Sequence, residues 1–207
     1  MTNNDIEHIV HSYCDDENFF KSITEISASK ETPPESVIYS DFKILFFDKL
    51  SDEVNRINFD NELSYKHKSV DGLYFIKEGG IFKLYFIEFK HVNSKPGRSR
   101  KNLAKIKIEL KLKALESLFC VLPHIIENYY GENFVNSIQS QLLDIPKYYI
   151  SVLKDRGNIN KSNEHVIKSS DFLDMERLSK YPFTKSKVVS PKEFESFMKK
   201  KFYNNLI

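Results

Sequence analysis

The sequence predicts an α/β protein with a central mixed sheet that is flanked by helices and carries extra helices at both ends. An apolar hairpin over 70–76 and 81–92 provides the centre of the sheet. A long helical pattern covers about 101–121, and a segment rich in aromatic and β-branched residues, 145–155, predicts a further strand. Strands and helices that alternate in this way favour a layered domain.

The predicted core begins with a helix over 35–50, because apolar residues recur there at helical spacing, at positions 38, 42, 45, 46 and 50. A weak strand candidate follows at about 54–60. Upstream, residues 5–28 show broken helical spacing and predict one or two short helices. The hairpin then ends in the loop NSKPGRS, whose glycine and proline interrupt regular structure.

The helix predicted over 101–121 is apolar around most of its circumference, so we expect it to be covered on more than one side. Its narrow polar strip consists of Lys105, Glu109, Lys113 and Glu116. Pro123 starts or kinks a second helix over about 123–142. A last amphipathic helix is predicted over 191–203.

Length and composition indicate one domain in a reducing compartment. The chain of 207 residues suits a single domain, 1–207, with a core over 35–155 and peripheral additions at 1–34 and 156–207. Its apolar runs are too short to cross a bilayer, and its N-terminus lacks a signal-peptide pattern. The two cysteines form no metal or disulfide pattern. We therefore expect a cytoplasmic protein with no membrane partner.

The charge is unevenly distributed. Residues 90–113 contain nine lysines and arginines and one acid, a net charge of +8, whereas the whole chain carries +2. Such a cationic segment predicts an anionic partner, nucleic acid first. We expect the phosphate backbone to bind the loop residues Lys95, Arg98, Arg100 and Lys101. The alternative is a solvated lysine-rich face.

Three charged residues occupy the apolar hairpin. Glu88 and Lys90 point to the same face of their strand, because side chains alternate. The length of the turn at Gly79-Gly80 decides where Asp71 lies. A two-residue turn places it opposite Glu88, a four-residue loop makes it a diagonal neighbour on the same face, and a three-residue loop puts it on the other face.

Two neighbouring carboxylates repel each other unless a proton or a cation lies between them. Mg²⁺ binds through one or two carboxylates together with water and substrate phosphate. Lys90 could then hold a metal-bound water or help to deprotonate it. The alternative is a solvated stripe on an edge strand, but this strand is apolar on both faces, which is typical of a central strand.

The order of these elements resembles the PD-(D/E)XK nuclease superfamily, which includes many restriction endonucleases and archaeal Holliday junction resolvases. Asp71 matches its first motif position, although Val70 stands where the family often has Pro, and Glu88-Phe89-Lys90 matches the Glu-x-Lys. The resemblance covers about 35–155. Its helix, three strands, helix and strand map to 35–50, about 54–60, 71–76, 82–90, 101–121 and 146–153.

The resemblance implies a restriction-endonuclease-like core and a Mg²⁺- or Mn²⁺-dependent endonuclease that hydrolyses phosphodiester bonds in DNA. It implies that Asp71 and Glu88 bind the metal with the carbonyl of Phe89, and that Lys90 assists the attacking water. Family members often add a catalytic acid from the first helix. Of the candidates, Glu35, Asp41 and Asp48, we select Asp41, because it borders the buried face of the helix predicted there; the alternative is an exposed helix acid.

Two further hypotheses stay open at this point. A nuclease-fold protein without activity could bind nucleic acid or a protein partner, and cleavage of both strands would favour a homodimer. The pair Tyr148-Tyr149 either stacks on bases or packs in the core.

Overall fold

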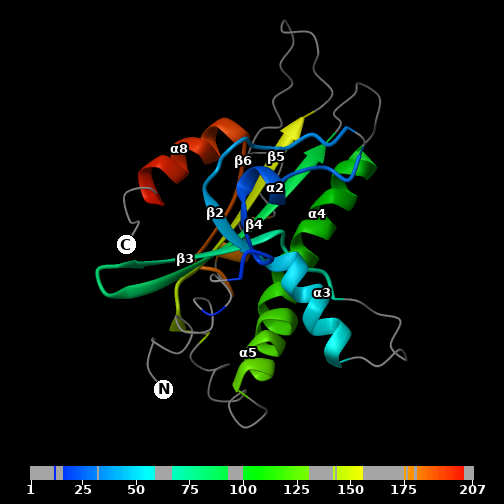
Figure 1. Ribbon diagram of the computed structural model, residues 1–207. Coiled ribbons are helices and arrows are strands. Elements are labelled where there is room, and N and C mark those ends of the chain that lie inside the picture. The colour runs from blue at the N-terminus through cyan, green and yellow to red at the C-terminus, as the bar shows by residue number, and fades with distance from the viewer. Residues whose placement is uncertain are drawn as a thin grey trace, which may run out of the picture.

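The computed structural model describes residues 12, 16–31, 33–58, 67–92, 100–130, 142, 144–155, 175, 177–179 and 181–202. Six strands form one mixed sheet in the order β1-β2-β3-β4-β5-β6, antiparallel from β1 to β4 and parallel from β4 to β6 (Figure 1). The strands are β1 (Phe20–Ser22), β2 (Lys43–Phe46), β3 (Gly72–Glu78), β4 (Ile81–Val92), β5 (Lys147–Asp155) and β6 (Lys185–Val189). The predicted α/β class is confirmed.

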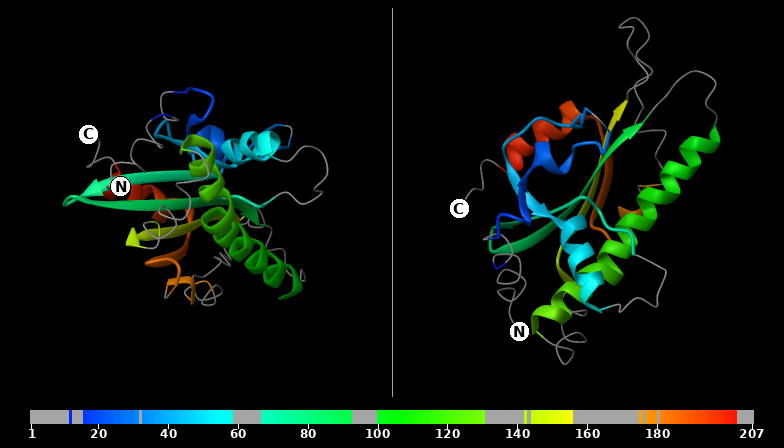
Figure 2. Two further views of the ribbon diagram at one scale, coloured as in Figure 1. Left: turned by 90° about the horizontal axis from the view of Figure 1, so that it is seen from below. Right: turned by 45° about the vertical axis from the view of Figure 1, so that its right-hand side comes forward.

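Helices cover both faces of this sheet (Figure 2). One face packs against α3 (Phe47–Asn58), α4 (Arg100–Glu116) and α5 (Leu122–Tyr130), with a π-helical turn, Ser117–Val121, between the last two. The other face packs against α2 (Ile23–Ile26) and α8 (Pro191–Lys201). A short 3₁₀ helix spans Arg177–Ser179. Among the described residues, no helix has the length and apolar character needed to cross a membrane.

β4 is the central strand, as its apolar pattern predicts, since it pairs with β3 on one side and β5 on the other. Its even-numbered residues Phe82, Leu84 and Phe86 enter the core below α4. The intervening Tyr85, Ile87 and Phe89 enter the core below α8. Alternation along one extended strand therefore supplies both cores.

The β3–β4 hairpin closes with a two-residue turn. Glu78 pairs with Ile81, and the intervening Gly79 and Gly80 have φ angles of 61° and 79°, which favour glycine in a type I′ turn. The same register pairs Gly72 with Ile87. Asp71 precedes Gly72, so it lies beside Glu88, as the first of the three turn lengths predicts.

The helix predicted over 35–50 is wrong in most of its length. Residues 43–46 form β2, and the helix begins only at Phe47 and continues to Asn58. The strand predicted at about 54–60 is therefore wrong over 54–58, and residues 59 and 60 lie outside the described part of the chain. Ile44 packs in the core below α8, whereas its neighbour Leu45 packs in the core below α3 and α4. Such alternation is a strand pattern. The apolar residues of the first turn of α3 follow directly, and the two sets together mimic helical spacing.

The segments outside 35–155 contribute directly to the sheet. β1 and β6 are its two edge strands. Phe194 and Phe202, near the two ends of α8, are fully buried in the core below that helix.

Candidate functional site

Glu88 is a buried carboxylate near the end of β4, on the face that α4 covers. Its side chain is 2% exposed. The ammonium of Lys113, on α4, contacts both carboxylate oxygens, with Nζ–O distances of 2.8 and 2.9 Å. A buried carboxylate is tolerated only where such a partner offsets its loss of hydration.

Asp71 shares this ammonium. Lys113 Nζ lies 3.5 Å from Oδ1 of Asp71, and the backbone N–H of Phe89 donates a hydrogen bond of 2.6 Å to Oδ2. The two carboxylates that the sequence predicted to be neighbours therefore converge on one lysine. Lys113 stands where a bridging cation would be expected.

Two backbone anchors fix the position of Asp71. The N–H of Phe47, at the start of α3, donates to the main-chain carbonyl of Asp71 over 3.0 Å. The N–H of Val70 donates to the hydroxyl of Ser117 over 2.8 Å. Ser117 begins the π-helical turn after α4, a distortion often found at functional sites. The end of α4 therefore holds the start of β3 in place.

Lys90 lies on the same strand face as Glu88 and forms an ion pair with Glu109 of α4. Glu109 and Lys113 are four residues apart, so both face the sheet from one side of the helix. The sequence prediction did not identify either residue as part of the site. Both residues belong to the narrow polar strip that the sequence shows on this otherwise apolar helix. That strip indicated them, because charged residues between apolar sides of a covered helix need charged partners.

The acid near this cluster is Asp48, not Asp41. Asp48, in the first turn of α3, accepts a 2.5 Å hydrogen bond from the hydroxyl of Ser69. Burial raises the pKa of Asp71, and the charge of Asp48 adds a smaller effect in the same direction. Asp41 is exposed and precedes β2, so the helix that justified its selection does not exist there. Glu35 instead forms an ion pair of 2.7 Å with Lys154.

The two carboxylates and one ammonium of Asp71, Glu88 and Lys113 carry a net negative charge, and most of it is withdrawn from solvent. Burial, and then the charge of Asp71, raise the pKa of Glu88 well above its ordinary value, although Lys113 opposes this. Burial also raises the pKa of Asp71, against the effects of Lys113 and the Phe89 N–H. Burial acts to lower the pKa of Lys113, but the carboxylates of Asp71 and Glu88 outweigh it and raise that pKa. The single positive charge of Lys113 thus neutralises only part of the negative charge of Asp71 and Glu88.

The donor set fits a hard divalent cation in part. Among the described residues, no group of three or more His, Cys, Asp or Glu side chains is arranged to hold a metal ion. Asp71 and Glu88 do converge, however, and Mg²⁺ needs only one or two carboxylates when water and substrate phosphate complete its shell. Phe89 directs its N–H toward Asp71, and its carbonyl faces the same side of the strand. These three groups could hold the ion if Lys113 moved away.

Most of the predicted nucleic-acid-binding loop lies outside the part of the chain that the structure describes. Lys95 and Arg98 lie outside the described residues, as do the side chains of Arg100 and Lys101, whose backbone opens α4. Their contact with nucleic acid stays a prediction.

Comparisons with known proteins returned no similarity: the chain matches no protein-family model, no curated protein and no solved structure. The resemblance to the nuclease superfamily consequently rests on the motif residues and their arrangement.

Proposed function

We propose that this protein is a metal-dependent endonuclease of the PD-(D/E)XK type that hydrolyses phosphodiester bonds in DNA. One observation carries the proposal: Asp71 and Glu88 lie beside each other in the central hairpin and share one ammonium, with Lys90 two residues along the same strand face. Two close carboxylates that share a single ammonium leave negative charge that a divalent cation can neutralise.

The topology supports the proposal with one departure. β2, β3 and β4 form an antiparallel meander, and the α4–α5 crossover then leads to the parallel strand β5. Apart from α3, which lies between β2 and β3, this is the order of strands and helices expected of a restriction-endonuclease-like core. The departure concerns the first helix, since α3 follows β2, and the helix that precedes β2 is the four-residue α2.

In this proposal Asp71, Glu88 and the carbonyl of Phe89 hold Mg²⁺ or Mn²⁺. A metal ion bound there would polarise the phosphoryl oxygen and lower the pKa of a coordinated water. Lys113 would release its two carboxylates as the cation binds. Asp48 adds negative charge from the side of α3 and strengthens the attraction for a cation.

Lys90 has a different role, because an ammonium carries no lone pair and cannot bind a metal. It is held by Glu109 in this structure. From that position it can orient the attacking water or stabilise the charge that develops on the phosphate. The released ammonium of Lys113 adds a second positive charge near the same phosphate.

A second candidate function is a nuclease-fold protein that binds nucleic acid without cleaving it. The observation in its favour is that the ion cluster is already paired internally, Lys113 with Asp71 and Glu88, and Lys90 with Glu109. Carboxylates that are already paired with lysines of the same cluster do not require a metal ion.

Cleavage assays separate the two candidates. Supercoiled, linear, branched and single-stranded DNA, and an RNA of matched sequence, are incubated with Mg²⁺ or Mn²⁺ and the wild-type protein, Asp71→Asn or Glu88→Gln. We expect metal-dependent cleavage of a DNA substrate by the wild type and none by either variant. Cleavage that both variants retain would refute the proposed site, and binding without cleavage of any substrate would favour the second candidate.

A further inference from the structure

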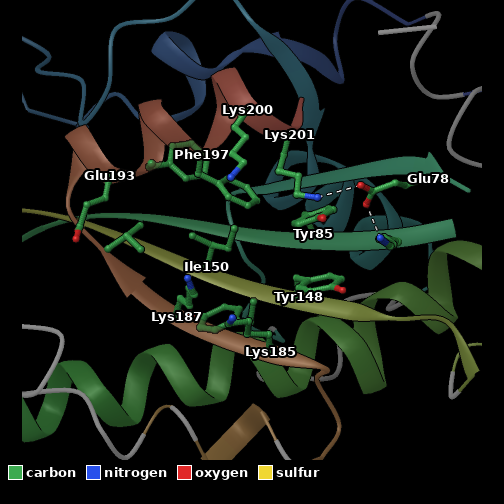
Figure 3. A pocket seen from close by; sticks show the side chains of 14 residues that line it. Glu78, Tyr85, Tyr148, Ile150, Lys185, Lys187, Glu193, Phe197, Lys200 and Lys201 are labelled. Carbon is green, nitrogen blue, oxygen red and sulfur yellow. Dashed lines mark hydrogen bonds and ion pairs between the residues drawn. The ribbon is translucent and has the colours of Figure 1, made fainter. Parts of the chain in front are cut away.

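A cavity of about 480 Å³ lies between the sheet and α8 (Figure 3). Asp71 and Glu88 lie on the opposite face of the sheet, where they contact Lys113 of α4. Side chains from the sheet, the edge strand β6 among them, and from α8 line it. Its volume falls within the range of about 300–1,000 Å³ that is usual for small-molecule sites. None of the residues proposed for the nuclease site lines this cavity.

The lining is strongly cationic, with five lysines and two glutamates. Both glutamates are committed to local contacts. Glu78 pairs with Lys83 and with Lys201, the latter over 3.0 Å. Glu193 caps α8, because its carboxylate accepts hydrogen bonds of 2.7 and 2.8 Å from the N–H and hydroxyl of Ser190.

Three further lysines line the cavity and bring positive charge to it. Lys185 and Lys187 extend from β6 and are exposed, and Lys200 approaches from α8 (Figure 3). Ammonium groups on two different elements thus surround one opening. Lysine is a compact point charge that suits a phosphate group.

Aromatic rings form another part of the lining. The rings of Tyr85 and Tyr148 stack with centroids 4.8 Å apart and an interplanar angle of 14°. The ring of Phe197, from α8, lies 5.8 Å from that of Tyr85. Tyr149, the other half of the tyrosine pair in the sequence, has its ring in the core below α4 instead. A planar group can therefore stack beside Tyr148 while an attached anion meets the lysines.

We propose that this cavity binds a nucleoside phosphate, with the base against Tyr148 and Phe197 and the phosphate at Lys185, Lys187 and Lys200. A nucleoside phosphate combines a planar ring, which suits the aromatic part of the lining, with an anion, which suits the lysines. The same chemistry is available from a free nucleotide and from the nucleotides of a single strand. The inference does not depend on nuclease activity, because it uses other residues on the other face of the sheet.

The test is calorimetric titration of the full chain in EDTA with AMP, adenosine, inorganic phosphate and an octathymidylate strand. We expect AMP or the strand to bind at least about tenfold more tightly than adenosine or phosphate. Replacement of Lys185 and Lys187 together by Ala should weaken that binding about tenfold or more. The matched control, Lys192→Ala with Lys199→Ala, removes two exposed α8 lysines outside the cavity and should change it by less than about twofold.

The outcomes divide cleanly. Binding of AMP assigns the cavity to free nucleotides, whereas binding of the strand alone, lost in the β6 variant, assigns it to a nucleic-acid strand. Failure of both probes to bind would overturn the proposal, as would an equal loss in the control variant. Tyr148→Leu should weaken the binding of AMP but not of phosphate. Asp71→Asn should leave AMP affinity unchanged, and a loss there would place the ligand at the acidic site instead.

Discussion

The two faces of the sheet differ in the exposure of their charged side chains. Below α4, Glu88 is 2% exposed and Asp71 and Lys113 are each 18% exposed, so these charges are held by one another. Below α8, Lys185 and Lys187 are exposed around a cavity whose floor is apolar and aromatic. Buried charges cost several kcal/mol unless they are paired, whereas solvated ones cost little. Loss of a paired, buried charge on the α4 face should therefore lower stability strongly, whereas loss of a solvated charge on the α8 face should change stability only slightly.

The largest effect on stability is expected from Lys113→Ala. Removal of the shared ammonium leaves the buried Glu88 without its cation and Asp71 with only the Phe89 N–H, which should lower the free energy of unfolding by about 3–5 kcal/mol in the absence of divalent ions. Urea denaturation measures this, and Mn²⁺ should restore part of the loss. Lys105→Ala, an exposed lysine of the same helix, is the control and should be nearly neutral. Equal stability of Lys113→Ala and the wild type would show that the pairing contributes nothing.

Lys90→Ala should slow cleavage by a factor of about 10²–10³ while metal affinity stays near that of the wild type. The reason is chemical: the ammonium acts on water or on phosphate charge, and loss of one such group typically costs about 10²–10³ in rate. Paired assays of plasmid nicking and Mn²⁺ affinity test this, with thermal melts to check folding. A variant that cuts at the wild-type rate would make Lys90 structural.

The pH dependence of stability should differ between the wild type and Glu88→Gln. Because the folded-state pKa of Glu88 lies above its ordinary value of 4.5, the folded state holds the proton more tightly there. That contribution is fully present below pH 4.5 and is lost as the pH rises through the folded pKa, with a slope of at most about 1.4 kcal/mol per pH unit. Denaturation series across pH 4–8 should show this decline, relative to Glu88→Gln, in the wild type. Parallel curves would contradict the burial of an unbalanced charge.

The smallest effect is expected on the α8 face, from Glu78→Gln. The hydrogen bond from Lys83, with Lys201, lowers the pKa of Glu78 to about 2 from an ordinary value of 4.5. A lowered pKa stabilises the fold above pH 4.5, and this contribution disappears as the pH falls toward 2. Urea denaturation at pH 7 should show a loss well below that of Lys113→Ala, because the carboxylate is solvated. A comparable loss in both variants would erase the contrast between the faces.

The sequence predicted the parts of the fold that local rules determine. The Gly79-Gly80 turn, the alternation along β4 and the helix α4 could each be read from neighbouring residues. The sequence left the turn length open, and the observed two-residue turn is the one of the three alternatives that places Asp71 directly opposite Glu88. Residues 35–50 could not be assigned in this way. A strand of four residues that runs straight into a helix mimics a helical period, and only pairing of β2 with β1 and β3 resolves it.

The missing members of the candidate site have a similar explanation. Asp48 lies near Asp71 because α3 begins at Phe47. The start of that helix depends in turn on where β2 ends. Glu109 and Lys113 reach the site through the packing of α4 across the sheet, which connects residues distant in sequence. Spacing along the chain marks which helix residues share a side, but not which part of the sheet that side meets.

Competition between Lys113 and a divalent cation tests the central claim most directly. Calorimetric titration with Mn²⁺ should compare the wild type with Lys113→Met and Asp71→Asn, each in metal-free buffer. We expect Lys113→Met to bind Mn²⁺ more tightly than the wild type, because the ammonium no longer occupies the space between the carboxylates, and Asp71→Asn to lose binding. Absence of Mn²⁺ binding by both the wild type and Lys113→Met would show that Asp71 and Glu88 form an ion cluster and not a metal site.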